Sequence, residues 1–381
     1  MLKVLAGDLS ATFNLDGLHG QRYLARHNEV AQSLCEQLVL HDQVFVPTSD
    51  YLAAAGLIEL FGEYAVIDLL ESEQLQFVRL RGLFGYARGT GRDGGLVTFG
   101  DPENKRPQDS PIEASIAAGL STVKSKLTGR GKLAQLLAEK SHPMELSQVL
   151  GAVRDNVYAD LRKTPLWNDY YSFHKPGLLK LPGLEKMQTR VLGPTTNATN
   201  DPIDALLAIT LTNIELYLSK QFNCTSMSTG SPVGDCIDLK LSHLQRSHPA
   251  RSRLWSFLEV ASVPNLAAVT LADSKKFASL LRLTHSRNAR LFREWFHQTA
   301  VLTEQEVSAR FVDLMYEVPW ASTAPIKTLR YCISAGLASV PYLGHAASLL
   351  DTFLLDRLFR GNSAKYFVDD LRSFRGKIGI R

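Results

Sequence analysis

Two short runs of strand-forming residues, separated by helical sequence, most constrain how the first 80 residues can fold. Residues 43–47 (QVFVP) and 75–80 (LQFVRL) are rich in β-branched and aromatic side chains. Apolar residues at helical spacing predict a helix over 24–40, and the segment between the two runs predicts helices over 51–61 and 64–72. Consecutive strands connected through helices pair in parallel, so this order predicts an α/β unit with a crossover connection.

The remainder of the chain predicts a hairpin followed by helices. Seven glycines over 82–100 are followed by a further strand-like run rather than a helix, which favours a β-hairpin over a phosphate-binding loop. A capping box at 110–113 opens a helix and places a boundary near residue 105. We therefore expect a mixed α/β protein with an acidic α/β unit (1–105), a helical domain (106–240) and a basic, then apolar, helical region (241–381).

The chain has the composition of an intracellular multidomain protein. Its 381 residues exceed the size at which a single core usually stops growing. The first residues lack the apolar run of a signal peptide, and the four cysteines form no CxxC pair. We expect a cytoplasmic protein with reduced thiols.

Three aspartates near the predicted strands are the candidate catalytic residues. Asp8 ends a short apolar N-terminal segment, and Asp42 and Asp50 flank the strand at 43–46. Carboxylates at strand ends can converge on a divalent cation, and such ions promote phosphodiester cleavage. Asp8, Asp42 and Asp50 are thus predicted to hold Mg²⁺ or Mn²⁺. The alternative is structural, with Asp50 as a helix cap and Asp42 as a turn residue.

An N-terminal strand that ends in Asp8, followed by a helix-rich α/β unit, is similar to metal-dependent ribonucleases of the PIN class. The resemblance covers at most residues 1–80 and implies a metal-dependent nuclease. The distal acidic cluster expected of that class is not identifiable in this sequence.

Charge is segregated along the chain. Residues 1–80 hold 4 Lys/Arg against 11 Asp/Glu, whereas residues 240–293 hold 10 Lys/Arg against 2 acids, although the whole chain carries only +4. This asymmetry indicates either an anionic partner for the basic region or pairing of the acidic and basic parts within or between subunits.

The basic region is the stronger sequence signal for a ligand. Within a predicted helix over 286–296, Arg287 and Arg290 share one face, while aromatic residues occupy another. Arginine side chains fit phosphate groups in a bidentate manner. The predicted nucleic-acid-binding residues are Arg246, Arg251, Arg253, Lys275, Lys276, Arg287, Arg290 and Arg293.

Residues 331–350 contain no Asp, Glu, Lys or Arg. We expect a buried pair of helices there, broken at Pro341, with a latent membrane segment as the alternative. The favoured function is an anion-binding protein that contacts RNA or DNA, with metal-dependent nuclease activity as its enzymatic form. The alternatives are a regulatory or scaffold protein, including a homo-oligomer that pairs its acidic and basic parts, and an effector that acts on anionic membranes.

Overall fold

A computed structural model of the chain describes residues 1–10, 21–87, 95–99, 110–162, 202–229, 263, 265–272, 274–298 and 366–371. The chain forms two compact units, which are described separately. Unit 1 comprises Met1–Leu34 and His41–Leu244, and unit 2 comprises Cys35–Leu40 and Gln245–Arg381.

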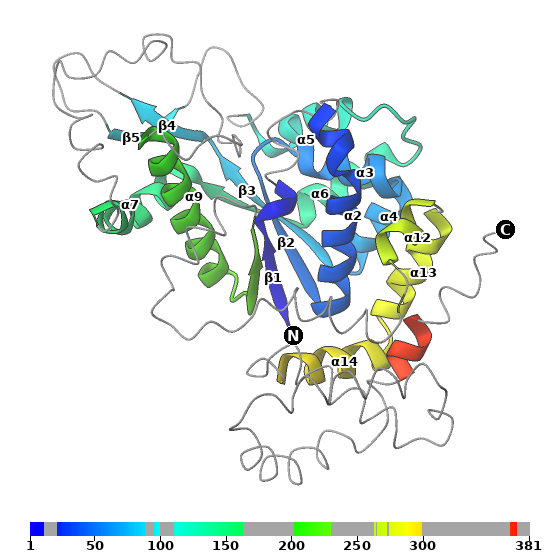
Figure 1. Cartoon of the computed structure of the whole chain (residues 1–381). Coiled ribbons are helices and arrows are strands. Elements are labelled where there is room, and N and C mark those ends of the chain that lie inside the picture. Colours follow the sequence, from blue (N-terminus) through cyan, green and yellow to red (C-terminus); the bar gives the residue numbers. More distant parts are fainter. Residues whose placement is uncertain are drawn as a thin grey trace, which may run out of the picture. The chain divides into compact units, whose positions relative to one another are not determined.

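Unit 1 is built around five parallel strands in the order β6-β3-β2-β1-β7 (Figure 1). The strands are β1 (Lys3–Ala6), β2 (Gln43–Thr48), β3 (Leu75–Arg81), β6 (Ser141–Glu145) and β7 (Ser226–Ser228). Leu5 pairs with Phe45 on one side and with Met227 on the other. The parallel pairing of β1, β2 and β3 confirms the mixed α/β class and the crossover connection.

Strands β6 and β7 form the two edges of the sheet, in a region that we expected to be helical. Strand β6 contains Pro143, which an edge strand tolerates, and β7 is only three residues long. Both strands pair with the N-terminal part of the chain. The sheet therefore continues past the boundary predicted near residue 105, which itself lies outside the described residues.

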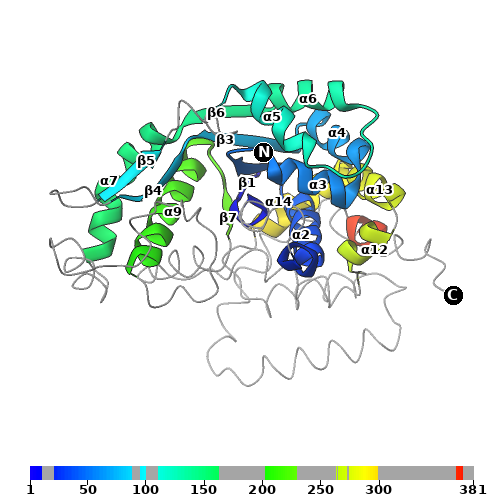
Figure 2. The same ribbon diagram turned by 90° about the horizontal axis from the view of Figure 1, so that it is seen from above.

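Helices lie on both sides of this sheet (Figure 1). One group comprises α2 (Gln21–Leu40), α3 (Leu52–Phe61), α4 (Glu63–Glu71), α5 (Ile112–Ser121) and α6 (Arg130–Glu139). The other comprises α7 (Leu146–Arg162) and α9 (Pro202–Gln221). Figure 2 shows the same two groups from above. Helices on both faces explain why β1 and β2 are buried along nearly their whole length.

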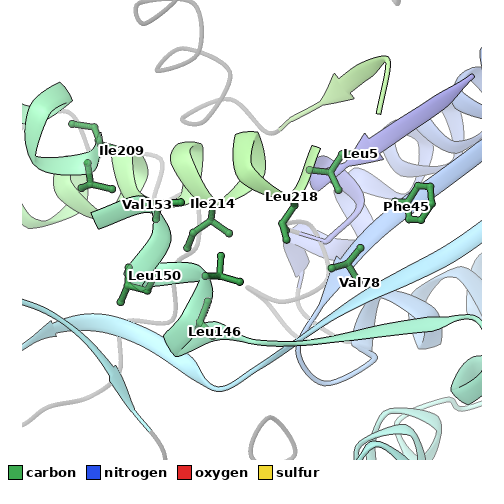
Figure 3. Packing of buried hydrophobic residues seen from close by; sticks show 11 residues of the cluster. Leu5, Phe45, Val78, Leu146, Leu150, Val153, Ile209, Ile214 and Leu218 are labelled. Carbon is green, nitrogen blue, oxygen red and sulfur yellow. The ribbon is translucent and has the colours of Figure 1, made fainter. Parts of the chain in front are cut away.

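The face covered by α7 and α9 carries the main apolar cluster. Leu5, Phe45 and Val78 come from three neighbouring strands (Figure 3). The helices contribute the rest, among them Leu146, Val149, Leu150, Val153, Val157, Ile209, Ile214 and Leu218. The opposite face carries Phe77, whose ring lies 5.9 Å from that of Tyr51. The apolar cluster on the first face fixes α9 against the sheet.

The predicted β-hairpin is confirmed. Strands β4 (Leu83–Ala87) and β5 (Gly95–Phe99) pair antiparallel, from Leu83 opposite Phe99 to Ala87 opposite Gly95. Gly82 joins β3 to β4 with φ of 103°, a conformation that favours glycine.

In its described part, unit 2 is helical. Its helices include α12 (Leu266–Ala272), α13 (Ser274–Thr284) and α14 (Arg287–Gln298), and a further helical segment covers 366–371. Phe292 of α14 packs on Phe367, with ring centroids 5.1 Å apart. Ser286 accepts a hydrogen bond from the N–H of Ala289 and so caps α14.

Among the helices that the structure describes, none is long and apolar enough to cross a membrane. Residues 331–350 lie outside the described residues, so the alternative predicted for that segment stays a prediction.

Candidate functional site

The strand order reverses direction at β1. From β1 the chain adds β2, β3 and β6 on one side, and it later returns to place β7 on the other side. In parallel α/β sheets, ligands bind outside the carboxyl ends of the strands at such a switch point. The residues that follow Ala6 and Ser228 therefore occupy the position where a site is expected, because these two residues pair directly.

Asp8 stands at this position. It lies in a helical turn over residues 7–10, directly after β1, and it is half-buried. Its Oδ2 accepts hydrogen bonds from Ser33 Oγ of α2 at 2.5 Å and from Ser228 Oγ at 2.9 Å. Two hydroxyl groups from different elements thus orient one carboxylate at the carboxyl edge of the sheet.

Glu215 of α9 brings a second carboxylate to the same place. A Cβ atom on Gly7, the residue before Asp8, would lie 2.6 Å from the carboxyl carbon of Glu215. The carboxylate therefore rests directly on the backbone of Gly7, and only glycine leaves room for it. Glu215 is 4% exposed, and within the described structure its Oε2 has no hydrogen-bond partner.

The environment of Glu215 disfavours its charged form. Burial and the nearby charge of Asp8 raise the pKa of Glu215 to about 8. A buried carboxyl group beside a second carboxylate is a common property of catalytic and cation-binding sites. The arrangement can hold a proton at neutral pH, or it can bind a cation that removes the repulsion.

The other two predicted aspartates do not join this pair. Asp42 precedes β2, and its Oδ2 accepts the N–H of Leu2 at 2.7 Å at the amino edge of the sheet. Strand β1 separates that edge from Asp8 by about 13 Å, whereas carboxylate oxygens lie roughly 2.0–2.6 Å from a bound ion. The structure therefore does not bring Asp42 to Asp8.

Asp50 lies at the same edge as Asp8 but acts in the first turn of α3. Its Oδ1 accepts the N–H of Leu52, the first residue of α3, at 3.1 Å, while the N-cap position itself is occupied by Tyr51. Burial raises the pKa of Asp50. Across the described ranges, no group of three or more Asp, Glu, His or Cys side chains is placed to hold a metal ion.

The structure places five of the predicted nucleic-acid-binding residues, all of them in unit 2. Lys275, Arg287 and Arg290 are exposed, and Lys276 is half-buried. Arg290 Nε lies 4.0 Å from Glu294 Oε1 on the exposed face of α14. Arg246, Arg251 and Arg253 lie outside the described residues.

Arg293 does not belong to that exposed face. It is 4% exposed, and its guanidinium donates to the carbonyl oxygens of Leu38 at 3.3 Å and Thr284 at 3.0 Å. Helical spacing explains the difference, because Arg293 falls beside the buried Phe292 and Phe296. Its role in the structure is to connect backbone segments within unit 2.

Sequence reasoning missed Glu215, Ser33 and Ser228. One signal could have found Glu215, since it is the only charged residue between Asp204 and Lys220 in a helix that is otherwise largely apolar. Such a residue is rarely buried without a purpose. The two serines carry no comparable signal.

In comparisons with known proteins, no family model, curated protein or solved structure matches this chain.

Proposed function

We propose that this chain is a divalent-cation-dependent phosphodiester hydrolase that acts on nucleic acid, with Asp8 and Glu215 as the cation-binding carboxylates. The observation that supports this proposal is the place of the buried Glu215 carboxylate against Gly7, the residue before Asp8, at the switch point of a parallel sheet. The PIN-class resemblance of residues 1–80 predicted a cation at Asp8, and Glu215 replaces Asp42 and Asp50 as its partner.

The side chains present fit a hard cation. Mg²⁺ is commonly held by one or two carboxylates, while water and substrate phosphate complete its coordination. Ser33 and Ser228 fix the Asp8 carboxylate, and the buried Glu215 offers an Oε2 that no described group engages. When bound, such a cation activates water and neutralises charge on the leaving oxygen.

The choice of a polyanionic substrate is supported by the exposed cations of unit 2. Lys275, Arg287 and Arg290 present positive charge to solvent. Phosphate contacts of this kind attract nucleic acid independently of sequence and weaken steeply with salt.

The deciding experiment compares Asp8→Asn with a matched Asp42→Asn control in thermal melts with and without Mg²⁺ or Mn²⁺. The wild type and Asp42→Asn should be stabilised, by about 2.7 kcal/mol at one hundred times the dissociation constant. Asp8→Asn should lose both this rise and the hydrolysis of labelled RNA or DNA. An equal rise in Asp8→Asn would contradict the proposal.

A second candidate is non-enzymatic binding of a polyanion by unit 2, favoured by the exposed face of α14. Retention of RNA or DNA by wild type and Asp8→Asn alike, without hydrolysis by either, would select it. The double variant Arg287→Ala/Arg290→Ala should then lose retention.

A further inference from the structure

Tyr64 is an exposed aromatic residue held in a fixed position. It is the second residue of α4 and is 68% exposed. In the described structure, the other exposed large hydrophobic residues are Met1 and Tyr366. Its hydroxyl shares a hydrogen bond with Thr128 Oγ1 at 3.0 Å. The ring is thus tethered at one end while it remains open to solvent.

The loop that joins α5 to α6 is anchored beside Tyr64 by two glutamates. Glu63 accepts the N–H groups of Thr128 and Gly129, each at 2.8 Å. Glu59 accepts the N–H groups of Lys124 and Ser125. Because these backbone groups are bound to carboxylates of α3 and α4, the backbone that carries the side chains of the loop is held in place.

That loop and the start of α6 carry four positively charged side chains and no acid of their own. Residues 122–132 contain Lys124, Lys126, Arg130 and Lys132 and no acidic residue. Lys132 pairs with Glu71 at 2.6 Å, whereas Lys124, Lys126 and Arg130 are exposed and take part in no ion pair within the described structure. Glu59 Oε1 and both carboxylate oxygens of Glu63 accept hydrogen bonds from the loop backbone. Two exposed acids lie on α4: Asp68, one turn beyond Tyr64, and Glu71, which pairs with Lys132.

We propose that Tyr64 together with Lys124, Lys126 and Arg130 forms a binding surface for single-stranded nucleic acid. An exposed ring on which a base can stack, beside cations that follow the phosphates, is the combination that single-strand-binding proteins use. A duplex hides its base faces, and an anionic membrane offers nothing to stack on a tethered ring. The proposal rests on the proposed function for the choice of nucleic acid, and it adds the form of the substrate and a binding surface in unit 1.

Binding is measured by fluorescence anisotropy at low salt in EDTA, with labelled single strands of about 12 nucleotides. Tyr64→Leu should weaken binding by about 5- to 150-fold, the loss of one stacked base. Tyr64→Phe should keep most of the affinity, because the ring stays. Asp8→Asn should bind as the wild type does, since this surface needs no cation.

A salt titration tests two of the three cations, Lys124 and Lys126, separately from the ring. In Lys124→Ala/Lys126→Ala, the slope of log affinity against log salt should flatten by about 1.4, because each phosphate contact on a single strand contributes about 0.7. Lys132→Ala is the matched control and should leave the slope unchanged, since Glu71 already compensates Lys132.

Unchanged affinity of Tyr64→Leu, or equal affinity for a duplex that is independent of Tyr64, would overturn the proposal. So would binding of anionic vesicles with no binding of the oligonucleotide. If these results accompany loss of hydrolysis in Asp8→Asn, the proposed function stands and this surface fails. If Tyr64→Leu weakens binding while Asp8→Asn changes neither cation binding nor hydrolysis, the surface stands alone.

Discussion

Replacing Glu215 with glutamine removes one ionisable group from the site while it preserves the shape of the side chain. In the native protein, burial and the charge of Asp8 raise the pKa of Glu215 to about 8, from an ordinary value of 4.5. Between those two pH values the native state keeps a proton that the unfolded chain has lost. The free energy of unfolding of the wild type should therefore fall as pH rises through this interval.

The size of the effect follows from the pKa difference. Each pH unit within the interval removes up to about 1.36 kcal/mol, so the full interval removes roughly 5 kcal/mol. Below pH 4.5 the group is protonated in both states and contributes nothing, and above pH 8 the loss is complete. Glutamine stays neutral throughout, and any stability offset that its amide introduces is constant with pH.

The assay is urea unfolding of wild type and Glu215→Gln between pH 4 and pH 9 in EDTA, followed by a probe in unit 1. The free energy of unfolding of the variant should exceed that of the wild type by an amount that grows from about pH 5 and reaches several kcal/mol at pH 8. This difference is a large share of typical domain stability. Two parallel pH profiles would refute the reasoning, because they would mean that Glu215 ionises normally in the folded protein.

Two further predictions concern residues outside the carboxylate pair. Arg293→Ala should destabilise unit 2 by roughly 2–4 kcal/mol in thermal or urea unfolding, since it removes buried hydrogen bonds to two carbonyl oxygens. The folded variant should keep its affinity for nucleic acid in a gel shift. Lost affinity without lost stability would mean that Arg293 contacts nucleic acid after all. Gly119→Ala should destabilise unit 1 by about 1–3 kcal/mol, because the new methyl group would lie 2.8 Å from Asp50 O and Tyr51 Cβ. Gly131→Ala in α6, where a methyl group meets open space, is its control and should not destabilise.

The central strands and their helices could be predicted because their sequences are unambiguous. The run at 43–47 and the run at 75–80 each combine valine and phenylalanine, which favour strands, and they form β2 and β3. The hairpin followed from its glycines. The edge strands β6 and β7 could not be predicted, since SHPME and SMS are polar, short and, in β6, interrupted by proline. Edge strands need little apolar surface, so tertiary pairing determines them.

The candidate site could be predicted only in part, and the reason is distance along the chain. Asp8 was found because it ends a strand, but its neighbours Ser33, Glu215 and Ser228 reach it from 25 to 220 residues away. Asp42 and Asp50 flank the same strand, β2, so they lie at opposite edges of the sheet. Parallel strands bring together only the ends that point the same way, which separates Asp42 from Asp8. Asp50 lies at the edge of Asp8, but its carboxylate accepts the N–H of Leu52 at the start of α3.

Glu215 is best understood through the way α9 is held. Asn213 donates to Asp160 Oδ2 of α7 at 3.0 Å and to the carbonyl of Ile209 at 2.9 Å. Positions two apart on a helix point about 200° from one another, so Asn213 faces α7 while Glu215 faces Gly7. The Asn213 bond stabilises the fold, because a hydrogen bond to a charged group contributes about 1.5–3 kcal/mol.

The buried Glu215 has the opposite effect on stability. No described group satisfies its Oε2, and its ionisation costs roughly 5 kcal/mol above pH 8. A residue whose ionisation weakens the fold, and for which the backbone of Gly7 leaves room, is what the proposed cation site would require.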